Sequence, residues 1–287
     1  MSEGRGGGSG SGRSPGNLTL RVISGLVLGV LALALTYWGG MAFRLFTAVL
    51  AVLVFHEWMA MRPSQGRAHA IVAWVAFAAA LIAMLAGMSA PAVFVAIGAA
   101  LLLALFHSVF SGNGTWSAAG IAYAGLPTAA LAQLRGDDTP GLIAILFLFG
   151  TVWATDVFAY FVGRTFGGPK LAPAISSGKT WSGAVGGAAG AILAGTAVVL
   201  LSGSSMPFGW AVVLALLLSV VSQAGDLFES ALKRRSGVKD SGTLIPGHGG
   251  VMDRVDGLVA AALVLYWLGI VFSGYAAPAE WFLPMRV

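Results

Sequence analysis

No cysteine occurs in this chain of 287 residues, and charged residues make up only 9% of it. The absence of cysteine excludes disulfide bonds, catalysis by a thiolate and zinc sites built on sulfur, although it leaves the cellular compartment open. Hydrophobic residues account for 57% of the sequence, and the mean hydropathy is +0.87. This composition excludes a soluble domain with an apolar core and indicates a polytopic membrane protein.

Several apolar runs are long enough to cross a membrane as helices, which takes about 20 residues each. They lie at 19–38, 42–61, 70–88, 90–111, 116–134, 141–163, 183–203, 207–227 and 257–275. We therefore predict an all-α, polytopic transmembrane bundle of about nine spans, in which Pro127 weakens the fifth. A cleaved signal peptide is not expected, because the first run is long enough to span the bilayer and no clear cleavage site follows it.

The basic residues predict how these spans are oriented. If the N-terminus is cytoplasmic, only Arg44, Arg135 and Arg286 face the other side, and the remaining 13 of the 16 lysines and arginines face the cytoplasm. The net charge of +5 lies mostly in short loops between apolar runs. This placement favours anionic lipid or nucleotide over nucleic acid as a partner.

The chain divides into three parts. Residues 1–17 are rich in glycine and serine and are expected to form a disordered tail. Transmembrane helices follow over 18–140, and a C-terminal transmembrane catalytic region follows over 141–287. The two charged loops of that region, 164–182 and 228–256, are both expected on the cytoplasmic face, where nucleotides are found.

Two carboxylates begin the last apolar run. Asp253 and Asp256 are three residues apart and would share one face of a helical turn. Paired carboxylate oxygens, together with substrate phosphates, are how Mg²⁺ is usually held. Stabilisation of a helix N-terminus is the simpler interpretation, but one acid would satisfy it. We therefore predict a metal site with Asp226 as a third ligand; Glu229 stays undecided, because a plain surface ion pair with Lys233 at i+4 would also explain it.

Basic side chains alternate with these acids. Such cations neutralise a triphosphate and a phosphomonoester, which otherwise repel each other. An ordinary cytoplasmic excess of positive charge would explain the cations but not the alternation. The residues concerned are Lys233, Arg234, Lys239 and Arg254. His248 lies beside Gly249 and Gly250 in a turn whose amides could cradle an anion, and we expect it to bind phosphate rather than act as a base.

The first charged loop contains Gly178, Lys179 and Thr180 in succession. This is not a P-loop, because Pro173 stands where the motif has its first glycine and no strand is expected before it. Lys179, with Ser176 and Thr180, is still expected to contact a phosphate or a lipid headgroup.

Three further features lie within the apolar runs. Asp156 lies late in the sixth span, where a carboxylate costs about 2.5–3.5 kcal/mol on insertion scales, so we expect it to be paired or to face a polar cavity. Small residues let membrane helices approach closely, and we interpret Gly183, Gly186, Gly187 and Gly190 in this way. His56 and Glu57 end the second span and are interpreted as an interfacial anchor beside Trp58.

The charged segments resemble the phosphatidate cytidylyltransferase (CDP-diacylglycerol synthase) family. Segment 230–256 matches the family signature at Ser230, Lys233, Arg234, Lys239, Asp240, His248, Gly249, Gly250, Asp253, Arg254 and Asp256. Weaker matches are Asp156 with Tyr160, Gly163 and Arg164, and the segment 176–183, where Ser177 and Ser182 replace the usual proline and glutamate. The resemblance extends from about 150 to 260.

This resemblance implies transfer of the cytidylyl group of CTP to phosphatidate in phospholipid biosynthesis, giving CDP-diacylglycerol and pyrophosphate with Mg²⁺. It implies an integral protein of a bacterial plasma membrane, with membrane lipids around it and the active site facing the cytoplasm. A second, monovalent cation and a homodimer are left open. The expected catalytic residues are Asp226, Lys233, Asp253 and Asp256, and of these Asp226, Asp253 and Asp256 are also expected to bind the metal ion. The expected substrate contacts are Ser176, Lys179, Thr180, Lys233, Arg234, Lys239, His248, Gly249, Gly250 and Arg254. Supporting roles are expected for Asp156, Tyr160 and Glu229.

Two other functions stay open at this point. A CTP-dependent kinase of a lipid alcohol would release CDP instead of pyrophosphate and would need a base for the hydroxyl, such as His248. A transporter of a phosphorylated anion could couple to protons through Asp156 and Asp226. Such transporters hold their ions near the bilayer midplane and often show internal repeats, and no repeat is obvious in this sequence.

Overall fold

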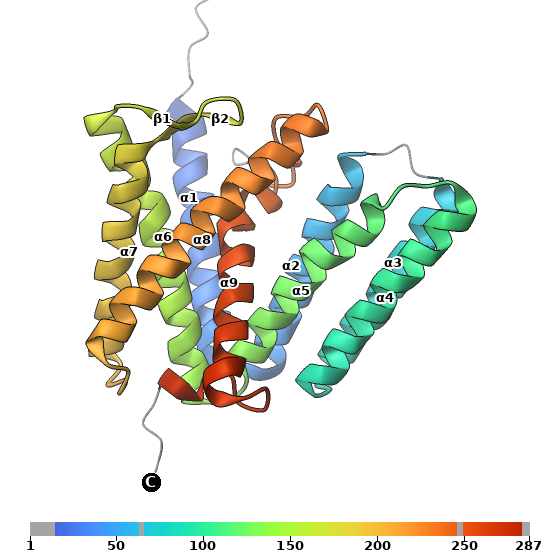
Figure 1. Cartoon of the computed structure of the whole chain (residues 1–287), viewed down its shortest axis with the longest axis horizontal. Helices are drawn as coiled ribbons and strands as arrows, with labels where there is room; N and C mark the ends of the chain where they lie inside the picture. Colours follow the sequence, from blue (N-terminus) through green and yellow to red (C-terminus); the bar gives the residue numbers. More distant parts are fainter. Residues whose placement is uncertain (1–14, 63–65, 246–248, 283–287) are drawn as a thin grey trace, which may run out of the picture.

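The computed structural model describes residues 15–62, 66–245 and 249–282. Within them the chain forms nine α-helices and one short antiparallel hairpin (Figure 1). The helices are α1 Pro15–Trp38, α2 Gly40–Ala60, α3 Arg67–Leu85, α4 Ala90–Ser111, α5 Trp116–Arg135, α6 Thr139–Phe166, α7 Trp181–Leu201, α8 Phe208–Arg235 and α9 Met252–Ser273. The hairpin strands are β1 Lys170–Ala172 and β2 Ser176–Thr180, and a 3-10 turn covers Glu280–Phe282. The predicted all-α bundle is confirmed.

Seven of these helices, α2 to α4 and α6 to α9, are long and apolar enough to cross a membrane. The structure therefore has the predicted nine helices, but within the described residues only seven of them are long and apolar enough to be membrane spans. In α1, the part whose side chains the structure describes, Ile23–Trp38, is also apolar, but this part alone is shorter than a span. Helix α5 contains Pro127 and is buried along most of its length by α2, α4 and α9. A helix surrounded by protein does not need the apolar exterior that lipid demands, which explains its weak hydropathy.

The exterior of the bundle is apolar, as a membrane requires. Phe110, Leu201 and Val271 have 75%, 88% and 75% of their surfaces exposed. So many large apolar side chains facing outward are typical of a surface covered by lipid rather than water. The structure is consistent with an integral membrane protein, while the cytoplasmic placement of the N-terminus stays a prediction.

Helices α6 and α7 lie side by side because glycine removes the side chains between them. A Cβ atom at Gly187 would stand 2.8 Å from the carbonyl oxygen of Thr155, and one at Gly183 would stand 2.8 Å from that of Ala159. At Gly186 the obstacle would be Val162. The predicted role of these glycines in close helix packing is confirmed, and the result is that α6 and the start of α7 share one wall of the site.

The boundaries of three charged segments differ from their predictions. Helix α8 continues to Arg235, so that Asp226, Glu229 and Lys233 lie on a helix and the following connection covers only 236–251. The loop expected at 164–182 contains the hairpin, in which Lys170 pairs with Thr180 and Ala172 with Ser176. The expected tail, 1–17, lies outside the described residues except for its last three, which begin α1.

Candidate active site

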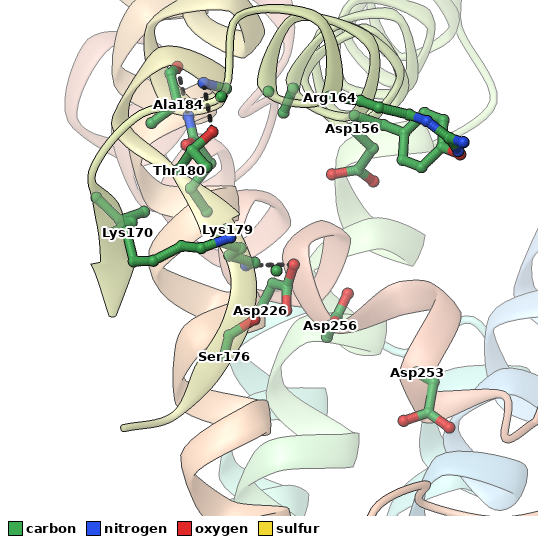
Figure 2. Close-up of a pocket in the computed structure, with 18 of the residues that line it drawn as sticks. Asp156, Arg164, Lys170, Ser176, Lys179, Thr180, Ala184, Asp226, Asp253 and Asp256 are labelled. Carbon is green, nitrogen blue, oxygen red and sulfur yellow. Dashed lines mark hydrogen bonds and ion pairs between the residues drawn. The ribbon is translucent and has the colours of Figure 1, made fainter. Parts of the chain in front are cut away.

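An open pocket of about 870 Å³ (Figure 2) lies at the end of the bundle that carries the hairpin and the α8–α9 connection, which is the upper end in Figure 1. Its walls come from α6, the hairpin, α7, α8 and α9. Acidic and basic side chains balance in it, five of each among the described residues that line it. They are Asp156, Asp226, Asp240, Asp253 and Asp256, and Arg164, Lys170, Lys179, Lys233 and Arg254.

Asp253, in the first turn of α9, is satisfied by protein groups. Lys233 places its ammonium 2.5 Å from Oδ1 of Asp253 and 2.6 Å from Oε2 of Glu229. The backbone amides of Ser241 and Gly250 donate to Oδ2 of Asp253 at 3.1 and 3.0 Å. Asp253 therefore fixes both the lysine on α8 and two points of the connection before α9, at Ser241 and Gly250.

The structure confirms that Glu229 and Lys233 form an ion pair, but the surface position expected for this pair is wrong. The pair is not a surface contact, because the side chain of Glu229 is fully buried and that of Lys233 is only 12% exposed. A buried carboxylate is costly unless it is paired, so Lys233 supports Glu229 as well as Asp253.

Asp226 is joined to the opposite wall of the pocket. Its carboxylate forms an ion pair with Lys179, which reaches across from β2 (Figure 2). Ser230, one turn later on α8, directs its hydroxyl toward Oδ1 of Asp226 at 3.4 Å. Figure 2 shows Asp256 beside this pair, and the Gly257 amide donates to Asp256 Oδ1 at 2.7 Å. Lys179 and Asp226 thus hold the hairpin to the core of the site.

The three predicted metal ligands do not converge on one point. All three line the pocket, but Figure 2 shows Asp253 apart from Asp226 and Asp256. Among the described residues, no group of three acidic or histidine side chains is arranged closely enough to hold a metal ion. The structure instead places Asp226 and Asp256 together, and Asp156 of α6 lines the same pocket.

The predicted substrate contacts divide into two groups. Ser176, Lys179, Thr180, Lys233 and Arg254 line the pocket, as does the supporting residue Tyr160. Arg234, Lys239, Gly249 and Gly250 are not among its described lining residues. His248 lies outside the described part of the chain.

Two of these predicted contacts have local structural roles. The amide of Gly250 donates to the Asp253 carboxylate, so it is already occupied by a protein group. Thr180 is the N-cap of α7, where its hydroxyl accepts a bond from the Gly183 amide at 3.1 Å.

The expectation that no strand precedes Gly178 is wrong, since Ser176–Thr180 forms strand β2. The rejection of a P-loop still stands on Pro173 and on the position of Lys179 within the strand itself. In a P-loop the lysine follows a glycine-rich loop at the start of a helix. Here Lys179 belongs to strand β2, and its ammonium pairs with Asp226 of α8 (Figure 2).

Arg164, Lys170, Gln223 and Asp240 line the pocket but carried no individual role in the sequence-based prediction of the site. Arg164 donates to the Tyr160 hydroxyl at 2.7 Å, which places its charge at the α6 side of the opening. Lys170 comes from β1, which was not expected. Gln223 lies three residues before Asp226 on α8 and donates to Ser219 at 3.2 Å. The helical spacing of Gln223 from Asp226 is the one signal that could have identified it.

Glu57 also lies elsewhere than expected. It is 1% exposed and accepts hydrogen bonds from the α8–α9 connection and the start of α9, so the interfacial-anchor interpretation is wrong for this residue. His56 beside it is exposed.

Comparison with known proteins agrees with this geometry. A family model described as "Cytidylyltransferase family" matches residues 19–272, so the similarity also includes the first half of the chain, beyond the segment 150–260. A protein of Brucella suis biovar 1 (strain 1330) named phosphatidate cytidylyltransferase is 47% identical over 270 residues, covering 93% of this chain and 98% of the relative. One of the same name from Bacillus subtilis (strain 168) is 30% identical over 263 residues, covering 88% and 98%.

Proposed function

This chain belongs to the cytidylyltransferase family, and we propose that it transfers the cytidylyl group of CTP to phosphatidate, giving CDP-diacylglycerol and pyrophosphate. The observation that carries the proposal is the pocket of balanced charge at one end of an apolar bundle. Lysines and arginines from α6, the hairpin, α8 and α9 suit a polyphosphate and a phosphomonoester, and the surrounding apolar exterior suits a lipid substrate. The relatives named above support this choice of substrates.

The proposed reaction needs charge neutralisation more than proton transfer. An oxygen of the phosphatidate phosphate forms a bond to the α-phosphorus of CTP, the bond from that phosphorus to the β-phosphate oxygen breaks, and pyrophosphate leaves with those electrons. The phosphate nucleophile is already ionised, so no side chain has to act as a base. Lys179, Lys233 and Arg254 would hold the phosphates in line, which supplies positioning and electrostatic stabilisation.

The donor set fits Mg²⁺. This ion usually keeps several waters and is bound by one or two carboxylates together with substrate phosphates. Asp226 and Asp256 provide such a pair, and the Lys179 ammonium at Asp226 shows that this carboxylate accommodates a positive charge. When bound, Mg²⁺ would offset negative charge on the triphosphate and the leaving pyrophosphate. Asp253 would have to give up its bonds to Lys233, Ser241 and Gly250 to join this pair, so we assign it to holding Lys233 and the α8–α9 connection. A second, monovalent cation stays open.

We also propose that the pocket faces the cytoplasm of a bacterial cell and that the lipid enters sideways from the adjacent leaflet. The excess of basic residues in the connections at this end supports that orientation. Sideways entry would keep the acyl chains in the membrane while the phosphate reaches the cations of the pocket.

The reaction is tested with detergent-purified protein given CTP, Mg²⁺ and phosphatidate, omitting each component in turn. We expect pyrophosphate release to require all three, with CDP-diacylglycerol appearing in the lipid fraction. Release of CDP in place of pyrophosphate would instead identify a CTP-dependent lipid kinase. If a folded sample that binds CTP forms neither product, the proposal is wrong.

A further inference from the structure

Glu57 lies on α2, in the half of the chain that contributes no residue to the described lining of the pocket. Its carboxylate is nevertheless bonded to the segment that carries the active-site acids. Oε1 accepts a hydrogen bond from the amide of Val251 at 2.8 Å. Oε2 accepts hydrogen bonds from the amide of Met252 at 2.8 Å and from the hydroxyl of Ser241 at 3.0 Å. These bonds connect residues nearly two hundred positions apart, immediately before Asp253.

Glu57 takes the place of a local helix cap. The N-cap position of α9 is Val251, whose side chain cannot accept a hydrogen bond. The first amides of a helix need an acceptor and carry positive partial charge, which a carboxylate stabilises. A serine or aspartate at position 251 would supply this locally. Here the acceptor comes from α2, so the start of α9 depends on where α2 lies.

Two glycines let Glu57 approach this closely. A Cβ atom at Gly242 would lie 2.6 Å from Oε1 of Glu57, and one at Gly250 would lie 2.6 Å from Oε2. Both distances are too short for real Cβ contacts. The backbone on either side of the carboxylate is therefore packed directly against it, and a shift of Glu57 would move that backbone.

A second carboxylate holds the same backbone from the side of the pocket. Ser241 donates its hydroxyl to Glu57 and its amide to Asp253. The three consecutive amides of Gly250, Val251 and Met252 are likewise divided between Asp253 and Glu57. Asp253 in turn holds Lys233 at 2.5 Å. One continuous set of bonds thus runs from α2 to the lysine in the pocket.

We infer that Glu57 is a positioning residue of the active site, which fixes Asp253, and through it Lys233, by holding Ser241 and the first turn of α9. Its effect on activity rests on the proposed function. The expected consequence is on turnover, because Glu57 itself does not line the pocket and a displacement of about 1 Å at reacting groups can cost as much as 100-fold in rate.

The test compares Glu57→Gln with wild type and with Asp137→Asn, which removes an acid at the other end of the bundle. Glutamine keeps the shape of the side chain, but one of the two oxygens becomes an NH₂ group. This group cannot accept the hydrogen bonds that the protein donates to Glu57 at that position. We expect kcat, normalised to the CTP-binding stoichiometry, to fall roughly 10- to 100-fold while KM for CTP changes less than about 3-fold. Hydrogen exchange at the Val251 and Met252 amides should become faster, and Asp137→Asn should change neither.

Gly242→Ala supplies an independent variant. It does not change residue 57, but the added Cβ atom displaces the Glu57 carboxylate, so this variant should show the same loss of kcat. A normal kcat per CTP-binding site in Glu57→Gln or Gly242→Ala would show that the contact serves stability alone and would overturn the inference. Unchanged exchange at Val251 and Met252 would also contradict it. If wild type itself has no transferase activity, the proposed function fails, whereas the exchange comparison still tests whether Glu57 holds the start of α9.

Discussion

Lys233 is enclosed between two acids, and its role depends on both. Its ammonium contacts Glu229, which is fully buried, and Asp253, whose side chain is 9% exposed. Removing one partner of a buried ion pair is costly because the other is left charged and unpaired. At the scale of single residues, stability and substrate binding are therefore tied together at this lysine.

For this reason we expect Lys233→Met to lower both stability and activity. The loss of stability should be on the order of 3 kcal/mol, because Glu229 and Asp253 lose a shared partner. The double variant Glu229→Gln with Lys233→Met should recover part of the melting temperature, since one buried charge is then removed, but it should recover no activity. Melting curves in detergent and pyrophosphate release measure the two effects. Recovery of turnover in the double variant would show that Lys233 has no role with substrate.

A second prediction separates the acids of the site. Asp226→Asn and Asp256→Asn should each abolish turnover in protein that remains folded, because they remove the carboxylates proposed to hold Mg²⁺. Asp253→Asn should also abolish turnover. In addition, it should make hydrogen exchange faster at the Gly250 amide, which donates a hydrogen bond to Asp253. Mg²⁺ titrations of CTP binding provide the measurement. Unaltered Mg²⁺ dependence in Asp226→Asn and Asp256→Asn would contradict their assignment.

Elements of regular structure differ in how far the sequence predicts them. Long apolar runs predict the helices well, and helical spacing predicts the Glu229–Lys233 pair. The two strands have only three and five residues and carry no alternating apolar pattern, so the hairpin could not be predicted. Contacts between distant elements, such as Lys179 with Asp226 or Glu57 with α9, depend on packing that has no local signal.

At this scale the contact between α6 and α7 is decisive, because α6 carries Asp156 and the two strands join the helices. Gly187→Leu should force them apart, since even a Cβ atom would stand 2.8 Å from the Thr155 carbonyl oxygen. We expect a lower melting temperature and little activity. Gly98→Ala on α4 is the matched control, because a Cβ atom there meets nothing within 4 Å, and alanine favours a helix over glycine. If Gly187→Leu has the same melting temperature as the wild type, the contact between α6 and α7 does not limit stability.

For the molecule as a whole, two buried charged residues connect the early helices to the later ones at opposite ends of the bundle. Glu57 does so beside the pocket. Arg135, at the end of α5 and 4% exposed, donates through Nε and Nη2 to the Thr36 and Tyr37 carbonyl oxygens of α1 at 2.5 and 3.1 Å. It also donates to the Asp138 carbonyl oxygen at 3.1 Å, just before α6. The guanidinium thus satisfies the last carbonyls of α1 and joins it to the α5–α6 turn.

This arrangement predicts that Arg135 affects stability without affecting the chemistry. Arg135→Lys should lower the melting temperature and Arg135→Ala should lower it further, because an ammonium cannot reproduce the planar donors of the guanidinium and alanine leaves the α1 carbonyls unsatisfied. The kcat and KM of the folded fraction should stay near wild type, in contrast to Glu57→Gln. A fall in kcat per CTP-binding site in Arg135→Ala would mean that the two ends of the bundle are coupled. Equal melting temperatures for all three proteins would mean that α1 is held by its apolar contacts alone.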